Sequence, residues 1–557
     1  MVKGRSVVVH GHFYQPPRDD PWLDRVIREP SAAPYHDWNE RIERECYRAM
    51  VAARRYAPDG RISEIVNVLA WISFDYGPTL LEWLERHAPR TYAGTLEADR
   101  LSAARLSGHG NAIAQPYHHV ILPLATRRDK MTEVRWGIAD FRRRFGRDPE
   151  GMWLPETAVD EETLDVLAAE GIKFTVLAPH QMKGAPGRGR PGRFRTSGGR
   201  SIALFPYDGD LSHGVAFGAY LRDAKVWRDQ MLERDADLVS LATDGETYGH
   251  HHRFGDVALA WVTGELEARK DVTLENFASF LARHPPERDV ELVAPSAWSC
   301  AHGVERWRSD CGCKMAPEKQ SQQAWRTPLR DGLDRLAEEL HAIYEPEAAR
   351  VFGDPWAARD AYGQIVGRLD RATAPLPVLP RDPQETARAR DLLELERNAL
   401  RMFTSCGWFF DDIAGIEAVQ ILRYAARAID LAGSDGPRLE ARLLQRLALA
   451  RSNDPALGTG ADVYRRLVRE RAPESPADPN PALARERTLE RAVEALEFDQ
   501  SPAALSAATE LVGRLSAEDL TVQFDAQTAL YWMLQRSAPA ARAALAPVAR
   551  SLGFAEF

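Results

Sequence analysis

Two carboxylates in different parts of the chain carry the chemistry that the sequence suggests. Glu156 stands directly behind Pro155 at the end of the apolar run 151–154, and Asp244 follows the apolar run 236–243. A charge at the end of a buried strand is costly unless it is compensated. Two such acids can split a glycosidic bond: one attacks or stabilises the positive carbon of the sugar, and the other protonates the leaving oxygen.

Histidines, amides and tryptophans gather near the same strand ends. Such side chains suit sugar recognition, because sugar faces are apolar patches ringed by hydroxyl groups. Loops are polar in any protein, so the recurrence at several strand ends, and not any single residue, predicts a site. The residues of this kind are His10, His12, Gln15, Gln115, His118, His119, Trp153 and Glu246.

The elements that must position these groups are predicted from seven β-rich runs that alternate with helical patterns up to about residue 300. This alternation is typical of a parallel α/β sheet, closed into a barrel or open and doubly wound, with its functional groups at the carboxyl ends of the strands. Helices are predicted over 131–146, ending at Gly146, and over 160–171. The predicted strands are 6–10, 64–72, 108–115, 151–155, 173–179, 201–206 and 236–243.

From about residue 320 the pattern changes to Ala, Leu, Arg and Glu at helical spacing, as in 328–344 and 439–452. Proline-rich breaks at 375–383 and 472–483 divide this part, and the tail beyond about 485 is plainly helical without visible chemistry. We expect an all-α helical bundle packed on the barrel. The predicted division is a barrel domain at 1–315 and a helical region at 316–557.

An aromatic and acidic run, Trp408 to Asp412, stands out in the helical region. It is either a core segment of a helix or part of a cleft against the barrel. We expect the second, with Trp408 and Asp411 at the site.

Cys300, Cys311 and Cys313 cluster in the sequence, with His302 nearby. Three thiols and a histidine can ligate zinc, but the spacing is not that of a paired CxxC site. The chain has five cysteines, an odd number that argues against a disulfide framework. We expect reduced thiols in a turning loop, with no bound metal and with His302 free to face the cleft.

Composition narrows the partners. Lys plus Arg is 72 and Asp plus Glu is 81, a formal net charge of −9 with no basic stripe, which disfavours nucleic acid. No stretch approaches the roughly 18 apolar residues of a membrane span, so we expect a cytoplasmic protein without a membrane partner.

Four segments then carry a family resemblance: "HGHFYQPP" (10–17), "GHGNAIAQPYHHVILPL" (108–124), "WLPET" (153–157) and "TDGETYGHH" (243–251). In this order they resemble glycoside hydrolase family 57, in the branch with an HGHFYQPPR-type first motif. The segment "FTSCGWFFDDIAGIE" (403–417) resembles the C-terminal domain of unknown function of that branch. Four ordered motifs are far more specific than any one alone.

The resemblance implies a (β/α)7 barrel followed by a helical bundle, and a retaining enzyme that acts on α-glucans as an amylase, 4-α-glucanotransferase or branching enzyme without a cofactor. It implies that Glu156 is the nucleophile and Asp244 the general acid and base. His10, His12, Trp153 and His251 match substrate-binding positions, and Trp408 and Asp411 match groups from the helical region. We also expect Gln15, Gln115, His118, Glu246, Trp298 and His302 to contact substrate.

Two features depart from the family pattern: Phe13 and Tyr14 intervene before Gln15, and the cysteine-bearing segment is not general in the family. Two other functions stay open. His10, His12 and a carboxylate can hold a metal in a carbohydrate hydrolase or deacetylase. Alternatively, the barrel binds a glucan without turnover. The sequence leaves open the choice between hydrolysis and transfer, and the oligomeric state.

Overall fold

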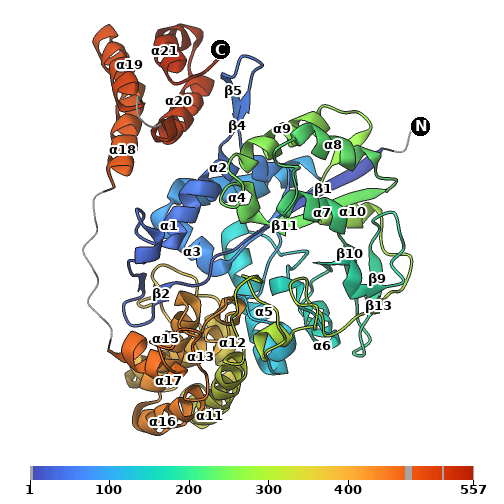
Figure 1. Cartoon of the computed structure of the whole chain (residues 1–557), viewed down its shortest axis with the longest axis vertical. Coiled ribbons are helices and arrows are strands. Elements are labelled where there is room, and N and C mark those ends of the chain that lie inside the picture. Colours follow the sequence, from blue (N-terminus) through green and yellow to red (C-terminus); the bar gives the residue numbers. More distant parts are fainter. Residues whose placement is uncertain (1–3, 471–479, 517–519, 556–557) are drawn as a thin grey trace.

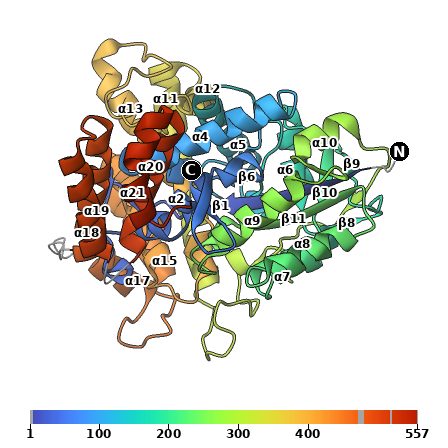
Figure 2. The same ribbon diagram turned by 90° about the horizontal axis from the view of Figure 1, so that it is seen from above.

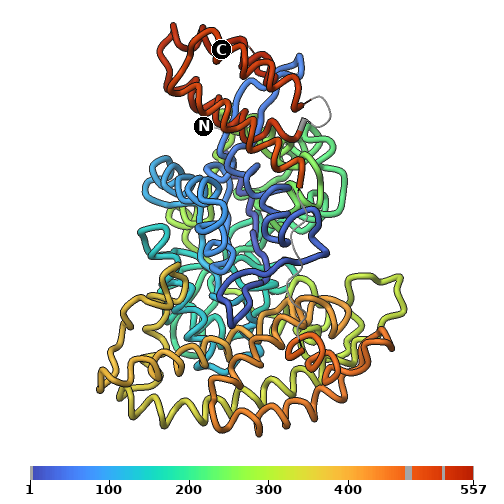
Figure 3. Tube along the Cα trace, turned by 90° about the vertical axis from the view of Figure 1, so that its left-hand side faces the viewer, coloured from blue at the N-terminus to red at the C-terminus, as the bar shows by residue number. Residues whose placement is uncertain are grey.

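The structure is a computed structural model of the chain, and it describes residues 4–470, 480–516 and 520–555. These residues form three layers along the long axis of the molecule (Figures 1 and 3). A barrel lies in the middle, the helices of residues 326–463 lie at one end, and the helices of residues 481–551 lie at the other.

Strand β1 (Arg5–Phe13) is the centre of the barrel wall that carries the candidate site. It pairs in parallel with β11 (Leu238–Asp244) on one side and with β6 (Ser73–Tyr76) on the other. The short β12 (Val272–Leu274) extends the β6 side near the start of β1. In this register His12 lies opposite Asp244 on one neighbour and opposite Asp75 on the other.

The remaining strands close the ring. Beyond β6, parallel bridges join Phe74 to Ala112, Ala114 to Met152, and Gly151 to β7 (Phe174–Leu177). Next, β10 (Ser201–Pro206) pairs in parallel with β7. The Asp208 amide then donates to the Ser240 carbonyl of β11 at 2.7 Å. The predicted (β/α)7 barrel is therefore confirmed, and its carboxyl ends meet on one face.

One predicted barrel strand was wrong. Residues 62–66 form β5 (Ile62–Val66), which pairs antiparallel with β4 (Ala53–Tyr56) in a hairpin outside the ring. The barrel strand comes later, as β6. The apolar residues Ile65, Val68 and Leu69 of the run 64–72 are buried. An apolar composition therefore does not distinguish a strand of this hairpin from a strand of the barrel.

Helices cover the outside of the barrel, as Figure 2 shows from above. The two predicted helices are confirmed: α5 (Arg127–Phe145) ends at Gly146 in the left-handed region, with φ of 68°, and α6 (Glu161–Ala169) begins at the cap Asp160. The others are α1 (Trp38–Ile42), α2 (Arg48–Val51), α3 (Pro78–His87), α4 (Pro89–Arg105), α7 (Gly209–Ala216), α8 (Ala224–Glu233), α9 (Gly255–Glu267) and α10 (Phe277–Arg283).

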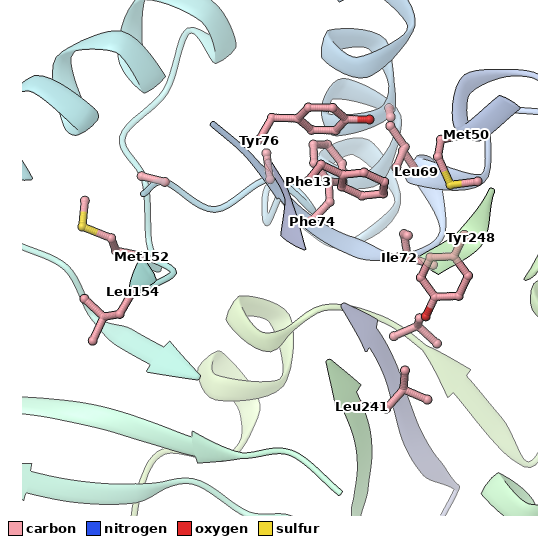
Figure 4. Packing of buried hydrophobic residues seen from close by; sticks show 14 of the residues in the cluster. Phe13, Met50, Leu69, Ile72, Phe74, Tyr76, Met152, Leu154, Leu241 and Tyr248 are labelled. Atoms are coloured by element: carbon pink, nitrogen blue, oxygen red, sulfur yellow. The ribbon is translucent and has the colours of Figure 1, made fainter. Parts of the chain in front are cut away.

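The core between strands and helices is apolar and aromatic. Phe13, Phe74 and Tyr76 pack together beneath the carboxyl ends of β1 and β6, and Leu241 of β11 lies in the same cluster (Figure 4). Phe13 and Tyr76 stack with ring centroids 4.6 Å apart. Rigid packing of this kind holds the strand ends, and the polar groups on them, in fixed positions.

The helical region after the barrel has its own core and also docks on the barrel. Leu329 and Leu333 of α11 (Arg326–Phe352) are fully buried in it. Trp136 of α5 donates its indole N–H to the Arg359 carbonyl at 3.0 Å. The helices after α11 are α12 (Pro355–Tyr362), α13 (Thr386–Arg401), α14 (Cys406–Phe409), α15 (Ile416–Leu431), α16 (Gly436–Leu447) and α17 (Gly460–Val463).

The last four helices pack on the β4–β5 hairpin, and Arg48 of α2 forms ion pairs with Glu486 and Asp525 in them. Ile62 and Ile65 share a buried cluster with Leu489 and Leu530, and the helices and hairpin lie side by side in Figure 1. They are α18 (Pro481–Glu494), α19 (Pro502–Ser516), α20 (Phe524–Arg536) and α21 (Pro539–Ser551).

The predicted break at 375–383 is a loop, and a short 3-10 turn begins at its last residue, Pro383. Most of the predicted break at 472–483 lies outside the described residues. Among the described helices, none combines the length and apolar character needed to cross a membrane. The division at 315/316 stays a proposal.

Candidate active site

Glu156 stands on a strained turn at the end of its strand segment. It lies within the 3-10 turn Pro155–Thr157 with φ of 58° and ψ of 19°, and Thr157 also has a positive φ of 49°. Left-handed backbone at residues other than glycine costs on the order of 1–3 kcal/mol and clusters at functional sites. The turn places the Glu156 side chain, which is half-buried, at the carboxyl face of the barrel.

Two side chains from the segment after the last barrel helix hold the Glu156 carboxylate. Trp298 donates its indole N–H to Oε2 at 3.1 Å, and Ser299 donates its hydroxyl to the same oxygen. The Trp298 amide also donates to the Glu156 carbonyl at 3.0 Å. These three hydrogen bonds fix the position of the carboxylate, as a nucleophile requires.

Asp244 ends β11 and lies near Glu156. Its side chain is accessible to solvent, yet the surrounding protein raises the pKa of Asp244 to about 6. The cationic His12 opposes that shift, and the negative charge of Glu156 adds to it. One acid is thus held by donors while its neighbour is pushed towards the protonated form, which is the pattern of a nucleophile paired with a general acid.

Asp75 joins the two histidines of the first motif. It is fully buried, and its oxygens accept from His10 Nε2 at 3.1 Å and from His12 Nδ1 at 2.8 Å. Burial lowers the pKa of His10. For His12, burial also acts to lower the pKa, but the charge and hydrogen bond of Asp75, with the charges of Asp244 and Glu246, outweigh it and raise the pKa to about 9. His12 is therefore a cation between acids.

Gln115 and His119 complete this polar layer. In the amide orientation that satisfies both of its groups, Gln115 donates to Asp75 Oδ2 at 3.2 Å and accepts from the Gly77 amide at 3.0 Å. His119 lies with Nε2 3.1 Å from His12 Nε2, and its Nδ1 is 2.7 Å from Ser405 Oγ. The helical region therefore reaches the site through Ser405.

Glu246 lies beside Asp244, under the loop that follows β1. Its carboxylate accepts from the Tyr47 hydroxyl and from the Tyr14 amide at 3.1 Å. Burial raises the pKa of Glu246 to about 7, the charge of Asp244 adds to the shift, and the Tyr47 hydrogen bond opposes it. Because the Glu246 side chain is buried, it holds the loop after β1 in place and does not face a ligand directly.

Trp153 forms the floor beneath the histidines. It is fully buried, and it stacks on His10 and His12 with centroids 4.8 and 5.2 Å away. Its edge meets Trp298 at 5.1 Å. Trp153 thus supports the layer from below, while the half-buried Trp298 is the tryptophan in contact with Glu156.

Gln15 and His251 lie at the rim. Gln15 accepts from Arg18 Nη2 at 3.1 Å. His251 is exposed and follows the turn after β11, and its amide donates to the Glu246 carbonyl at 2.9 Å. Neighbouring protein, together with His250 and His252, lowers the pKa of His251 to about 4, so it is a neutral imidazole near neutral pH.

Two further predicted residues lie away from Glu156 and Asp244. His118 is buried with Nδ1 2.7 Å from Glu133 of α5, and its ring packs near Trp136. Trp408 is buried in the core of the helical region, with Nε1 3.4 Å from the Arg326 carbonyl. The structure therefore does not bring either side chain to the two acids.

Asp411 and His302 are also engaged elsewhere. Asp411 accepts from the amides of Met315 and Ala316 at 2.8 and 3.0 Å, so it anchors a loop. His302 is not free to face the cleft as expected, because its Nδ1 lies 3.6 Å from Cys313 Sγ. The sequence alone did not exclude these residues, since polar side chains in loops serve anchoring as often as binding.

Several groups at the site were missed from the sequence. Asp75 was missed because the barrel strand was placed too early, although "SFDYGP" puts an acid near the end of a short apolar run, as "WLPE" does. Ser299 and Ser405 carry no sequence signal. Tyr207 follows β10, and burial, with the charge of Asp244, raises its pKa to about 12.

The histidine-based metal alternative gains no support from this geometry. His10 is fully buried, and the ring nitrogens of His10 and His12 that face Asp75 are engaged in hydrogen bonds with it. Among the described residues, the one group with metal-binding proximity is Cys300, His302, Cys311 and Cys313.

Comparison with known proteins agrees with the barrel and the motifs. Residues 18–292 match glycosyl hydrolase family 57, and residues 322–476 match a domain of unknown function, DUF3536. A 4-alpha-glucanotransferase of Thermococcus litoralis is 21% identical over 182 residues, 32% of this chain and 26% of that protein. An alpha-amylase of Pyrococcus horikoshii is 23% identical over 174 residues, 30% of this chain and 26% of that protein. The chain thus spans about a quarter of the length of these relatives.

Two solved structures share the fold. An exo-type maltose-forming amylase from Pyrococcus sp. ST04 superposes with a TM-score of 0.62 at 15% identity, covering 80% of this chain and 83% of that one. A branching enzyme from Pyrococcus horikoshii gives a TM-score of 0.50 at 16% identity, covering 86% and 99%. With the matched barrel, the ordered motifs and this common architecture, the chain belongs to glycosyl hydrolase family 57.

Proposed function

We propose that this protein is a retaining glycoside hydrolase or glucanotransferase that acts on α-glucans. The observation that carries the proposal is the pair Glu156 and Asp244 at the carboxyl ends of two barrel strands, one held by two donors and the other with its pKa raised to about 6. A retaining mechanism needs this difference between an ionised nucleophile and a protonated acid. The names of the relatives, an amylase and a 4-alpha-glucanotransferase, support the α-glucan substrate.

In the first step, a Glu156 oxygen attacks the anomeric carbon of the glucan while Asp244 donates its proton to the leaving glycosidic oxygen. The carboxylate of Asp244 then takes a proton from water or from the hydroxyl of an acceptor sugar, which attacks the same carbon and frees Glu156. His12, as a cation hydrogen-bonded to Asp75, offsets part of the negative charge that gathers around the two acids.

Tyr207 and Trp298 supply flat surfaces beside the acids, with ring centroids 6.5 Å apart and nearly perpendicular planes. Stacking on such rings suits the apolar faces of glucose units. His251 at the rim offers a neutral imidazole for hydroxyl groups.

The test is to incubate the protein with amylose, maltooligosaccharides, glycogen and pullulan and to resolve the products by length and branching. We expect new chain lengths or branch points from at least one substrate, with none formed by Glu156→Gln. The product pattern assigns hydrolysis, transfer or branching. If neither the wild-type protein nor Glu156→Gln changes the length or branching of any substrate, the proposal is contradicted and a glucan-binding role is favoured.

A further inference from the structure

A cluster of metal-ligating side chains lies beside the candidate active site. Cys300, His302, Cys311 and Cys313 each offer one ligand atom, and these atoms all lie within 4.8 Å of one another. Cys300 Sγ is 4.0 Å from Cys311 Sγ and 3.9 Å from Cys313 Sγ, and Cys313 Sγ is 3.6 Å from His302 Nδ1. The irregular spacing in the sequence favoured reduced thiols without a metal, but the fold brings the four side chains close enough to share one ion.

The separations fit a tetrahedral zinc ion. Zinc binds cysteine sulfur at about 2.3 Å and histidine nitrogen at about 2.0–2.1 Å, so the edges of the tetrahedron are about 3.8 Å between sulfurs and about 3.6 Å between sulfur and nitrogen. The two sulfur–sulfur separations and the sulfur–nitrogen separation given above lie at or close to these values. They are far longer than the roughly 2.05 Å of a disulfide, and all three cysteines are free.

The charges around the cluster provide a second, independent indication. Arg326 is fully buried and donates Nη1 to the Cys313 carbonyl at 2.8 Å, yet its Nε and Nη2 have no hydrogen-bond partner among the described residues. Arg306 adds a second positive charge that acts on Arg326, and Asp411 adds a negative one. A buried guanidinium with two nitrogens that lack a hydrogen-bond partner is costly without a counter-charge close to it.

Three neutral thiols do not supply that counter-charge. Three thiolates and a neutral histidine around Zn²⁺ carry a net charge of −1, which gives Arg326 a negative neighbour. Because zinc ligands must be deprotonated, metal binding and the compensation of Arg326 and Arg306 come together.

We propose that Cys300, His302, Cys311 and Cys313 bind one zinc ion in a tetrahedral site. All four positions are filled by protein, so the ion has no open position for water or substrate and its role is structural. Soft thiolate ligands in a tetrahedral arrangement select zinc over magnesium, calcium or manganese.

The position of the site gives it a second consequence, which rests on the proposed function. Cys300 directly follows Trp298 and Ser299, the two residues that hold the Glu156 carboxylate. Arg306 donates to the Ser299 carbonyl at 3.2 Å, and Asp411 holds the amides of Met315 and Ala316. Zinc would join the two ends of segment 298–316 and thereby fix the donors that orient Glu156.

The first experiment measures metal content in the intact chain, expressed with zinc supplementation and purified under reducing conditions. We expect about one zinc per wild-type chain, and loss of that zinc in Cys311→Ser and Cys313→Ser. His302 is exposed, so His302→Ala tests a ligand without opening a cavity and should weaken zinc binding at least tenfold, whereas His302→Cys should retain the ion. Cys406→Ser, a cysteine outside the cluster, is the matched control and should keep full zinc content.

Two results would overturn the site. One is a reduced wild-type protein that takes up no stoichiometric zinc when titrated against a chromophoric chelator. The other is unchanged zinc affinity in both Cys311→Ser and His302→Ala. Substitution with Co²⁺ gives a further check, since thiolate ligation produces a sulfur-to-cobalt charge-transfer band that each cysteine variant should diminish.

The second experiment separates the metal site from the proposed function. Removing zinc with a chelator should lower kcat on the preferred glucan about tenfold or more, because the donors to Glu156 lose their fixed position, and zinc should restore it. If the protein binds zinc but kcat does not change when the zinc is removed, the positioning role is rejected. Bound zinc in a protein that is inactive on every glucan would reject the proposed function and leave the metal site intact.

Discussion

At the scale of single residues, the environment of Asp244 predicts the pH dependence of the reaction. With a pKa of about 6, Asp244 is protonated below that pH and loses its proton above it, so kcat/KM should fall as pH rises through about 6. Asp244→Asn should lower kcat by about 10²–10⁴-fold on substrates that need protonation of the leaving group and should remove this limb of the profile.

Glu246 provides the control for that measurement, because burial and Asp244 raise its pKa to about 7. Glu246→Gln should keep the limb near pH 6 if Asp244 is the acid. If the fall in kcat/KM near pH 6 disappears in Glu246→Gln and remains in Asp244→Asn, Glu246 is the general acid instead.

The buried pair of Asp75 and His12 predicts a pH dependence of stability. His12 has a folded pKa of about 9, above its ordinary 6.5. The pair therefore contributes stability that is fully present below about pH 6.5 and is lost as pH rises through about 9. Asp75→Asn should lower the free energy of unfolding by about 3–5 kcal/mol near pH 6, since it leaves a buried cation without its partner.

Chemical denaturation of both proteins from pH 6 to pH 10 measures this effect, and the difference between them should shrink towards pH 10. Asp59→Asn, on an exposed turn where Asp59 pairs with Arg61, is the matched control. A difference for Asp75→Asn that stays constant across this range would show that His12 is not charged in the folded protein.

At the scale of elements, the helical region reaches the histidine layer of the site through the residues at the start of α14. Ser405, just before α14, holds His119 at 2.7 Å, and Cys406 Sγ lies 3.8 Å from the Tyr14 hydroxyl. Ser405→Ala should lower kcat/KM about fivefold, in keeping with the roughly 1 kcal/mol of a net hydrogen bond. Ser452→Ala, which removes a hydroxyl bound to Asp412 in the same region, should leave kcat/KM unchanged. Equal losses in both variants would point to a general loss of stability.

The sequence predicted most of the barrel because each strand except one is a short apolar run bounded by turns, and because α5 and α6 carry clear end signals. It failed at β6, because the hairpin before that strand contains an apolar run of its own, and Asp75 was missed as a result. The sequence also did not predict contacts between residues in different loops. These contacts depend on the paths of the loops, which local patterns do not encode; examples are Ser299 with Glu156, Ser405 with His119, and His302 with Cys313. The same limit explains why Trp408 and Asp411 were expected in the cleft.

At the scale of the whole molecule, the four C-terminal helices are held to the barrel through the β4–β5 hairpin. Leu530 of α20 is fully buried in that contact cluster, whereas Trp532, on the same helix, is 45% exposed. Leu530→Ala should destabilise this unit by about 2–5 kcal/mol, while Trp532→Ala should cost far less. Hydrogen exchange of α18 to α21 and of the hairpin reports the loss, and equal protection in both variants would contradict the packing.

In the proposed mechanism, Glu156 forms a covalent bond with the sugar, and Asp244 donates a proton in the first step and accepts one in the second. The most direct measurement uses Asp244→Asn with an α-maltosyl fluoride, whose fluoride leaves without protonation, so the first step proceeds and the second is slow. Acid quenching, digestion and mass spectrometry then locate the sugar on a peptide. A maltosyl ester on Glu156, absent from the double variant with Glu156→Gln, is the predicted result. An adduct on Glu246 or another residue, or turnover of the fluoride by the double variant at the rate of Asp244→Asn, would contradict it.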